Sequence, residues 1–224
     1  LLVFRVDELF PEQEGDDVPG GAFRKGQGTV VEQAEPGEAL EHGRVPADGK
    51  LPADGFLRPG GVGFPGLALV HYDQEKCTAA IHSAFERGLN YYDVAPAYGN
   101  GQCETKMGIG LQGLDRSKYF LACKTKKRDK EGCRKELEQS LRLLKTDYFD
   151  LYQLHHLVRP SEVQQALGPD GAMEAILEAR KAGKVRFIGY SAHTTKAALE
   201  VMKGFKFDTV MFPINFVEYY NRGF

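Results

Sequence analysis

The sequence lacks features that would place it in several other classes of protein. None of its four cysteines belongs to a Cys-x-x-Cys pair, which argues against zinc ribbons and thioredoxin-like redox motifs. No apolar run reaches the roughly 18 residues of a transmembrane helix, and the first ten residues lack the layout of a secretory signal. The net charge of −2 argues against a nucleic-acid-binding protein. We therefore expect a cytoplasmic protein that binds neither nucleic acid nor membrane, because widely spread cysteines also suit a reducing compartment.

Composition divides the chain near residue 60. Residues 1–60 hold 6 of the 11 prolines, 10 of the 26 glycines and a net charge of −6, whereas the remaining residues carry +4. The first region repeats the turn signal Pro-Ala-Asp-Gly and shows no sustained periodicity. We expect residues 1–59 to form an acidic, loosely ordered extension, with a small hairpin around 50–57 as the alternative. Residues 60–224 are then the folded domain.

From residue 60 onward, short apolar runs alternate with amphipathic stretches. Successive runs begin 24 to 35 residues apart, the length of a β-strand plus a crossover helix. A first strand is expected near the glycine-rich cluster at 60–63, and the later strands are predicted at 91–95, 119–124, 150–155, 185–191 and 209–215. Helices are predicted at 74–89, 135–145 and 172–182. Such repeats indicate a parallel sheet covered by helices.

Glycine spacing and polar residues distinguish a barrel from a doubly wound sheet. No predicted strand is followed by Gly-x-Gly-x-x-Gly, the dinucleotide fingerprint of the doubly wound fold, and the cluster at 60–63 has a different spacing. Polar residues instead end successive strands, where barrel enzymes carry their active sites. We predict an α/β fold of the (β/α)8 TIM-barrel class. Six strands precede Phe224, so we expect an incomplete barrel of about six of the eight βα units.

Four polar side chains lie at or near the ends of three successive strands. Asp93 lies in the strand at 91–95, with Tyr98 five residues after it, Lys124 ends the next strand, and His155 ends the one after that. In a barrel these ends converge on one mouth. The basic residues that follow Lys124, at 126–130, are expected on the surface. His155 and its neighbour His156 should point to opposite faces of the sheet.

This set of side chains suits the reduction of a carbonyl, which needs a hydride on carbon and a proton on oxygen. A tyrosine with its ordinary pKa of about 10 is a poor acid at neutral pH. The ammonium of Lys124 should lower the pKa of Tyr98 by favouring the phenolate, and Asp93 should hold that ammonium in place. His155 should orient the substrate oxygen. Proton transfer of this kind contributes about 10²–10⁴ in rate.

At these residues the chain resembles the aldo-keto reductase family. The matching motifs, in order, are Gly-Leu-Asn-Tyr-Tyr-Asp at 88–93, Ala-x-x-Tyr-Gly at 95–99, Glu-x-x-Met-Gly at 104–108, Ser-Leu-x-x-Leu-x-Thr-Asp-Tyr-x-Asp-Leu-Tyr-x-x-His at 140–155, and Gly-Lys-Val-Arg-x-Ile-Gly-x-Ser at 183–191. The resemblance implies a catalytic tetrad of Asp93, Tyr98, Lys124 and His155, with Tyr98 as the proton donor. It also implies NADP(H), or less often NAD(H), no metal, and a small carbonyl or alcohol substrate.

The chain departs from the family where the nicotinamide carboxamide is held. Ser191 fits the family's serine, but Ala192 stands in place of the usual asparagine and Met211 in place of the usual glutamine. Ser191 and Asn215 are the predicted cofactor contacts; the alternative for Ser191 is a cap for the helix that follows Thr194. The family's seventh and eighth strands, whose loops hold the rest of the cofactor, are missing here. The chain is therefore expected to be a fragment, and its own activity is an open question.

The sequence is also compatible with two other functions and with self-association. The fold could serve as a non-catalytic interaction module, as in the related potassium-channel β-subunits. A metal-dependent barrel hydrolase would use Asp93, His155 and His193, but it would leave the tyrosine and lysine without a role. An incomplete barrel also exposes two strand edges, which invites self-association. We expect one edge at Val62 and the other at Val210, Phe212 and Ile214.

Overall fold

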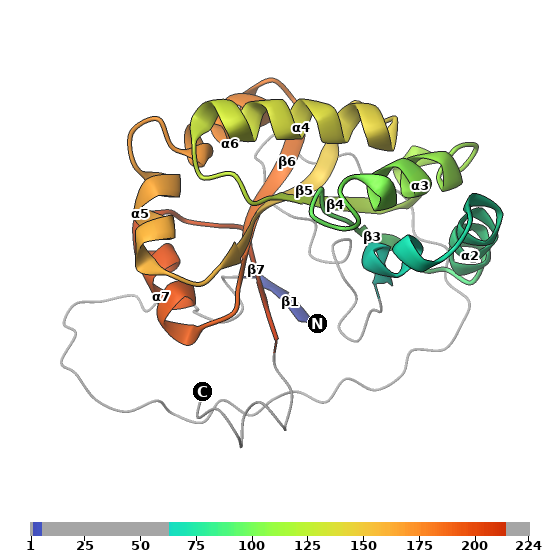
Figure 1. Cartoon of the computed structure of the whole chain (residues 1–224), viewed down its shortest axis with the longest axis horizontal. Helices are drawn as coiled ribbons and strands as arrows, with labels where there is room; N and C mark the ends of the chain where they lie inside the picture. The colour runs from blue at the N-terminus through green and yellow to red at the C-terminus, as the bar shows by residue number, and fades with distance from the viewer. Residues whose placement is uncertain (1, 6–62, 214–224) are drawn as a thin grey trace, which may run out of the picture.

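The computed structural model describes residues 2–5 and 63–213, which share a single curled sheet covered by helices (Figure 1). The strand order is β1-β7-β6-β5-β4-β3-β2, and β2 through β7 pair in parallel. These parallel strands are β2 (Phe64–Pro65), β3 (Tyr91–Asp93), β4 (Phe120–Thr125), β5 (Phe149–Leu157), β6 (Val185–Ala192) and β7 (Thr209–Phe212). Six parallel strands alternating with helices confirm the predicted (β/α) barrel in incomplete form.

The helices connect the strands and lie along the convex side of the sheet (Figure 1). They are α2 (Gln74–Glu86), α3 (Gln102–Gly110), α4 (Lys130–Leu144), α5 (Pro160–Leu167), α6 (Ala172–Lys181) and α7 (Thr195–Gly204), with 3-10 turns η1 (Gly66–His71) and η2 (Arg116–Lys118). Asp73, Asp129 and Thr194 cap α2, α4 and α7 by accepting a backbone N–H in the first turn. None of the described helices is long and apolar enough to cross a membrane.

The three predicted helices are present as α2, α4 and α6, while α3, α5 and α7 were not predicted. Helix α3 contains two glycines in nine residues and has no continuous apolar stripe, so periodicity could not reveal it. Helix α5 is only eight residues long and begins at Pro160, three residues after the last residue of β5. Short helices of this kind depend on packing against the sheet more than on their own propensity.

The apolar core lies between the sheet and the helices. Strand residues such as Leu121, Tyr152 and Ile188 are fully buried there against helix residues such as Leu137 and Ile176. The opposite face of the same strands, inside the curl, carries a much smaller apolar cluster made by Tyr91, Ala122, Leu151 and Phe187. Side chains alternate along each strand, so every strand contributes to both faces.

The amino-terminal strand β1 (Leu2–Arg5) corrects one expectation. It pairs antiparallel with β7, with Leu2 opposite Phe212 and Arg5 opposite Thr209. The sixth barrel strand is therefore not an open edge, because its backbone groups are bonded to a segment that sequence composition assigned to the irregular extension. The other residues named for the edges, Val62 and Ile214, and the proposed hairpin at 50–57 lie outside the described residues.

Candidate active site

The structure brings the four predicted catalytic side chains together at the carboxyl ends of β3, β4 and β5. Lys124 lies at their centre: its Nζ contacts the Asp93 carboxylate, donates to the Tyr98 hydroxyl at 3.4 Å and donates to the Val94 carbonyl at 3.4 Å. The rings of Tyr98 and His155 meet edge to face, with centroids 5.8 Å apart. The convergence follows from parallel pairing, since neighbouring strands all end at one edge of the sheet.

The loop between β3 and α3 positions Tyr98. The Tyr98 N–H donates to the Ala95 carbonyl, which forms a turn, and Gly99 follows with a left-handed φ of +61°. A Cβ at Gly99 would lie 2.8 Å from Val70 Cγ2, so a larger residue would clash there as well as strain the backbone. The tyrosine is thereby turned back over the end of β4, within reach of Lys124.

Lys124 is fully buried, and its charge is maintained by its neighbours. Burial alone lowers the pKa of an ammonium, but the adjacent Asp93 and Tyr98 more than offset this, and the pKa of Lys124 lies above its ordinary value. Burial in turn raises the pKa of Asp93, against the opposing pull of Lys124. The lysine therefore stays cationic at neutral pH and can stabilise negative charge on the tyrosine oxygen.

The direction of the Tyr98 shift differs from the prediction. Burial raises the pKa of Tyr98 above its ordinary value, and the opposing effect of Lys124, although present, is smaller. The charge of the lysine can be recognised from the sequence, whereas the cost of placing a phenolate in a partly buried site arises only in the folded chain. Tyr98 is therefore a protonated phenol at neutral pH, which is the form that can donate a proton.

His155 is a neutral imidazole in this site. Burial lowers its pKa to about 3, and the nearby charges of Lys124 and Lys126 act in the same direction. The side chain is 8% exposed, and its Nδ1 has no hydrogen-bond partner within the described part of the chain. A neutral imidazole of this kind can form a hydrogen bond with a substrate oxygen without carrying a charge into the site.

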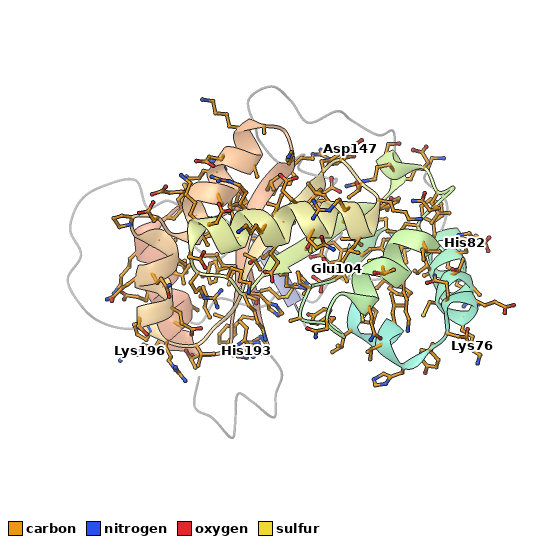
Figure 2. All side chains as sticks on the ribbon, turned by 45° about the horizontal axis from the view of Figure 1, so that its top comes forward. Lys76, His82, Glu104, Asp147, His193 and Lys196 are labelled. Atoms are coloured by element: carbon orange, nitrogen blue, oxygen red, sulfur yellow. The ribbon has the colours of Figure 1, made fainter. Side chains whose placement is uncertain are left out.

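The end of β5 is irregular at His155. The pairing of β5 with β6 shifts register between Leu154 and Leu157, and His156 has a left-handed φ of +60°. His155 is buried and His156 is exposed, as expected for opposite sides of the strand. The ring of His156 lies 4.5 Å, centroid to centroid, from that of His193. His193, which is labelled in Figure 2, follows the end of β6.

One basic residue predicted at the surface is buried. Arg128 is 8% exposed, and its guanidinium donates to the backbone carbonyl of His155 at 2.7 Å. Lys126 and Lys127 are exposed as predicted. A run of four basic residues carries no periodic signal that singles out its third member, so the sequence argument could not distinguish Arg128 from the others.

The predicted cofactor contacts have different outcomes. Ser191 lies buried at the mouth, where its Oγ accepts the His156 N–H at 2.8 Å and keeps a hydroxyl hydrogen to donate. Asn215 lies outside the described residues. Ala192 and Met211 are buried and offer no side-chain hydrogen bond of the kind that an amide would make.

The interior face of the sheet also carries polar groups that the sequence argument missed. Gln153 is fully buried two residues before His155, and neither of its amide atoms has a partner within the described residues. The Thr209 Oγ1 is likewise unpaired, and a Cβ on Gly189 would lie 2.2 Å from it. Together with the unpaired Nδ1 of His155, these atoms offer hydrogen bonds to a polar ligand or ordered water. The residues therefore fit the carbonyl and nicotinamide end of a bound cofactor and substrate.

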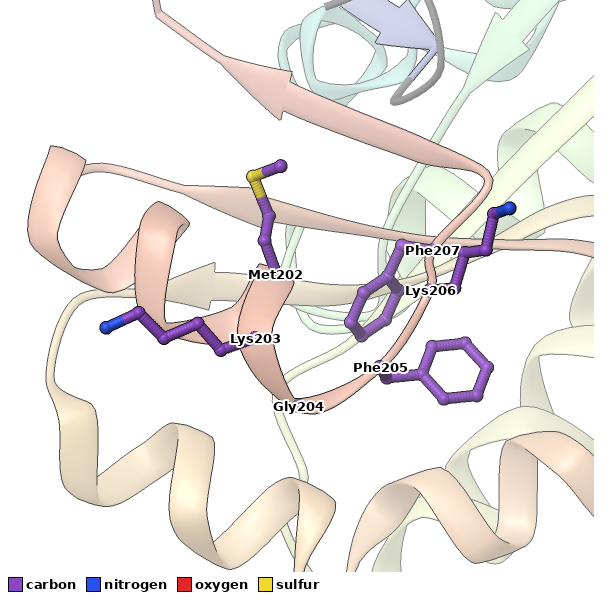
Figure 3. A pocket seen from close by; sticks show the side chains of 6 residues that line it. All are labelled: Met202, Lys203, Gly204, Phe205, Lys206 and Phe207. Atoms are coloured by element: carbon purple, nitrogen blue, oxygen red, sulfur yellow. The ribbon is translucent and has the colours of Figure 1, made fainter. Parts of the chain in front are cut away.

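Two other candidates for a site are the metal centre of the hydrolase alternative and a hollow beside α7. Within the described residues, no three side chains of His, Cys, Asp or Glu converge as a metal site would require, which leaves the hydrolase alternative without a ligand set. A hollow of about 380 Å³ lies where α7 leads into β7, lined by residues 202–207, with Met202, Phe205 and Phe207 around it (Figure 3). None of the tetrad residues lines this hollow.

Comparison with known proteins assigns the family. The model of the Aldo/keto reductase family matches residues 60–222. The L-galactose dehydrogenase of Arabidopsis thaliana is 33% identical over 125 residues, and the aldo-keto reductase YhdN of Bacillus subtilis is 32% identical over 130. These alignments cover 52% and 53% of this chain and 38% of each relative.

Solved structures agree. A holo aldo-keto reductase from Bacillus halodurans is 29% identical with a TM-score of 0.60, covering 68% of this chain and 53% of that one. An aldo-keto reductase from Klebsiella pneumoniae in complex with NADPH is 28% identical with a TM-score of 0.51, covering 65% and 48%. The chain therefore belongs to the aldo/keto reductase family, and it spans about half the length, or less, of these relatives.

Proposed function

We propose that this chain carries the catalytic centre of an oxidoreductase that interconverts an aldehyde or ketone and its alcohol with a nicotinamide cofactor. The observation that carries the proposal is the position of the Lys124 ammonium, which contacts both Asp93 and the Tyr98 hydroxyl. A neutral His155 faces the same hydroxyl-bearing ring. Together they form a proton donor with a built-in stabiliser for the anion that it leaves behind.

The proposed step transfers one hydride and one proton. When bound, the reduced cofactor supplies the hydride to the carbonyl carbon. Tyr98 gives its hydroxyl proton to the carbonyl oxygen, so that the carbonyl becomes an alcohol and the phenol becomes a phenolate. Lys124 stabilises that phenolate, and Asp93 keeps the ammonium in position. The phenolate then regains a proton from water, which restores the starting state.

His155 orients the substrate in this proposal. Its imidazole stands beside the Tyr98 ring and is neutral, so it can hydrogen-bond the carbonyl oxygen and leave the proton transfer to the tyrosine. A charged imidazole would compete with Tyr98 as the acid and would repel Lys124. The lowered pKa of His155 therefore supports a positioning part in the reaction over an acid-base part.

NADP(H) is the cofactor we propose first, with NAD(H) as the alternative. Support comes from the structural relatives from Klebsiella pneumoniae, which are complexes with NADPH and with NADP and acetate. We propose Ser191 as the contact to the carboxamide, because it is buried and its Oγ accepts the N–H of His156, the residue that follows His155. We propose Asn215 as a second contact on the strength of the family resemblance alone.

We also propose a reducing, cytoplasmic setting and a small-molecule substrate. All four cysteines are buried free thiols, which is usual where thiols are kept reduced. A small carbonyl or alcohol is the proposed substrate, as the family resemblance implies.

A matched pair of tyrosine variants tests the proposed reaction. The full chain is mixed with NADPH and a panel of aldehydes and ketones, and NADPH consumption is followed by absorbance. Tyr98→Phe removes the proton donor and should lower turnover by about a hundredfold or more. Tyr152→Phe makes the same change on the helix-facing side of the sheet, where the Tyr152 hydroxyl is buried and unpaired within the described residues, and should leave turnover unchanged.

The results of these assays distinguish a catalytic chain from a non-catalytic one. Equal turnover in Tyr98→Phe and the wild-type chain would show that Tyr98 is not the proton donor. NADPH that binds, as followed by its fluorescence, without being consumed by any substrate in the panel would contradict catalysis and favour a non-catalytic role. An absence of NADPH binding would show that the described nicotinamide-end contacts are insufficient for affinity.

A further inference from the structure

Arg128 is a buried cation outside the tetrad, and its hydrogen bonds lead to the catalytic histidine. It lies in the loop between β4 and α4 and is 8% exposed. Its Nη2 donates to the carbonyl of His155 at 2.7 Å and lies 3.4 Å from the carbonyl of His156, while Nη1 lies 3.4 Å from the Thr125 carbonyl. A buried guanidinium needs such partners, because removal from water without them is strongly unfavourable.

The segment that Arg128 contacts is the irregular end of β5. Register with β6 shifts between Leu154 and Leu157, and His156 adopts a left-handed φ, which is uncommon for a residue other than glycine. Ser191 bonds the His156 N–H from the β6 side, and Arg128 bonds the two histidine carbonyls from the β4 side. The bulge that aims His155 is therefore held from β6 on one side and from the loop after β4 on the other.

A carboxylate ties the same guanidinium to the next helix. Glu162 Oε1 lies 3.5 Å from Arg128 Nη2, and Glu162 Oε2 accepts the N–H groups of Val158 and Arg159 at 3.1 and 3.0 Å. These two residues follow β5 and lead into α5. One partly buried ion pair thus links the end of β4, the bulge of β5 and the start of α5.

We propose that Arg128 is a positioning residue, which holds the His155 bulge so that the imidazole stays packed against Tyr98 at the mouth of the barrel. The inference rests on the proposed function, because in that function His155 orients a substrate oxygen. The positioning of His155 itself depends only on contacts within the chain. The planar fork of arginine matters here, because Nη2 reaches the two histidine carbonyls and Glu162 while Nη1 reaches the Thr125 carbonyl, and the single nitrogen of an ammonium cannot span both positions.

Nuclear magnetic resonance of isotope-labelled histidine in the full chain tests the proposal without any assay of turnover. The pH titration of the His155 ring reports its surroundings, because burial and nearby cations hold its pKa at about 3, well below the ordinary 6.5. The charged and titratable groups facing it are Lys124, Lys126, Tyr98, His156 and His193. The His155 signal is assigned from its absence in His155→Gln.

The informative variant is Arg128→Lys, which keeps the positive charge and loses the fork. We expect the pKa of His155 to rise by about one pH unit or more, as the bulge loosens and water reaches the ring. Arg128→Met should give at least the same rise. Arg134→Met removes an exposed guanidinium on α4 that pairs with Glu131 of the same helix and with Glu178 of α6, and it should leave the His155 curve in place.

Each combination of results either supports or contradicts the positioning role of Arg128. A rise in both Arg128 variants, with Arg134→Met unchanged, supports positioning by the fork. A rise in Arg128→Met alone would mean that only the charge acts on the imidazole, and an unmoved curve in both would mean that the bulge holds without Arg128; either result overturns the proposal. If Arg128→Met does not fold, Arg128→Lys alone decides. A chain that reduces no carbonyl could still pass this test, so the two proposals fail separately.

Discussion

The two faces of the same strands are built differently. On the helix-facing side, Leu121, Cys123 and Tyr152 belong to one continuous apolar cluster that runs the length of the sheet. On the inner side, the apolar cluster is small, and next to it lie the buried Lys124 and Gln153. Alternation along a strand assigns neighbouring residues to opposite faces, so Cys123 belongs to the core and Lys124 to the site.

The helix-facing side contributes most of the stability of the fold, whereas the inner face carries the candidate site. The helix-facing cluster removes large side chains from water, which is the main favourable contribution to folding. The inner face has unpaired polar atoms on Asp93, Gln153, His155 and Thr209 within the described residues, which is unfavourable for the chain alone and useful to a ligand. Substitutions on the two faces should therefore affect different measurements.

The largest expected effect on the inner face comes from Lys124→Met. The substitution removes the charge that stabilises the Tyr98 phenolate in the proposed reaction, and it should lower the proposed NADPH-dependent carbonyl reduction by about 10²–10⁴. Asp93 is left without its partner and should be protonated more readily, since its burial already raises its pKa. Turnover measurements should show the lower rate, and circular dichroism should show that the fold is retained. An unchanged rate would contradict the assignment of catalysis to the inner face of the sheet.

The matching substitution on the helix-facing side is Leu121→Ala, three residues earlier in β4. Leu121 is fully buried in the large cluster, so truncation should lower the free energy of unfolding by about 2–5 kcal/mol. Turnover per folded molecule should stay near that of the wild-type chain. Urea denaturation measures the first quantity and active-site-normalised kinetics the second, and a rate loss as large as that of Lys124→Met would contradict the division of roles.

A pH dependence of stability should arise from His155. Its pKa is lowered to about 3 in the folded chain and is near 6.5 when unfolded, so the unfolded chain takes up the proton first. Stability is fully present above pH 6.5 and is lost as the pH falls toward 3. His155→Gln should remove this part of the acid sensitivity, up to a few kcal/mol at about 1.36 kcal/mol per pKa unit. Parallel acid-unfolding curves for the two chains would contradict it.

Glu104 should show the opposite sign on the helix-facing side. Burial raises its pKa above the ordinary 4.5, and Cys123 is near its carboxylate at 3.6 Å. A raised pKa means that its contribution to stability is present below 4.5 and is lost as the pH rises through the folded value. Glu104→Gln should therefore be neutral to stabilising by about 1 kcal/mol at neutral pH. A thermal melt at two pH values measures this, and a clear loss of stability at neutral pH would argue for an ionic role.

The smallest effect is expected for Tyr152→Phe. The Tyr152 hydroxyl is buried without a partner in the described residues, so its removal should change the free energy of unfolding by less than about 1 kcal/mol and could raise it. Chemical denaturation of the purified variant gives the value. A loss of several kcal/mol would show that this hydroxyl has a bonding partner, such as a buried water.

Much of the site could be predicted from the sequence because it depends on local order along the chain. The strand containing Asp93, the strand ending at Lys124 and the one containing His155 follow from apolar runs at regular intervals, and the barrel class brings their ends together. The positions of Arg128, Gln153 and strand β1 could not be predicted. Each depends on contacts between segments far apart in sequence, such as Arg128 with the end of β5 and β1 with β7.

The sequence by itself determined the family, the parallel order of strands and helices, and the identity of the four residues at the mouth, because periodicity and motif spacing are properties of the chain. The tertiary structure decided the ionisation of those residues. Lys124 favours a lower pKa for Tyr98, yet burial raises it, and the same burial keeps His155 neutral. Burial is set by every segment packed around a group, so its balance against a neighbouring charge exists only in the folded protein.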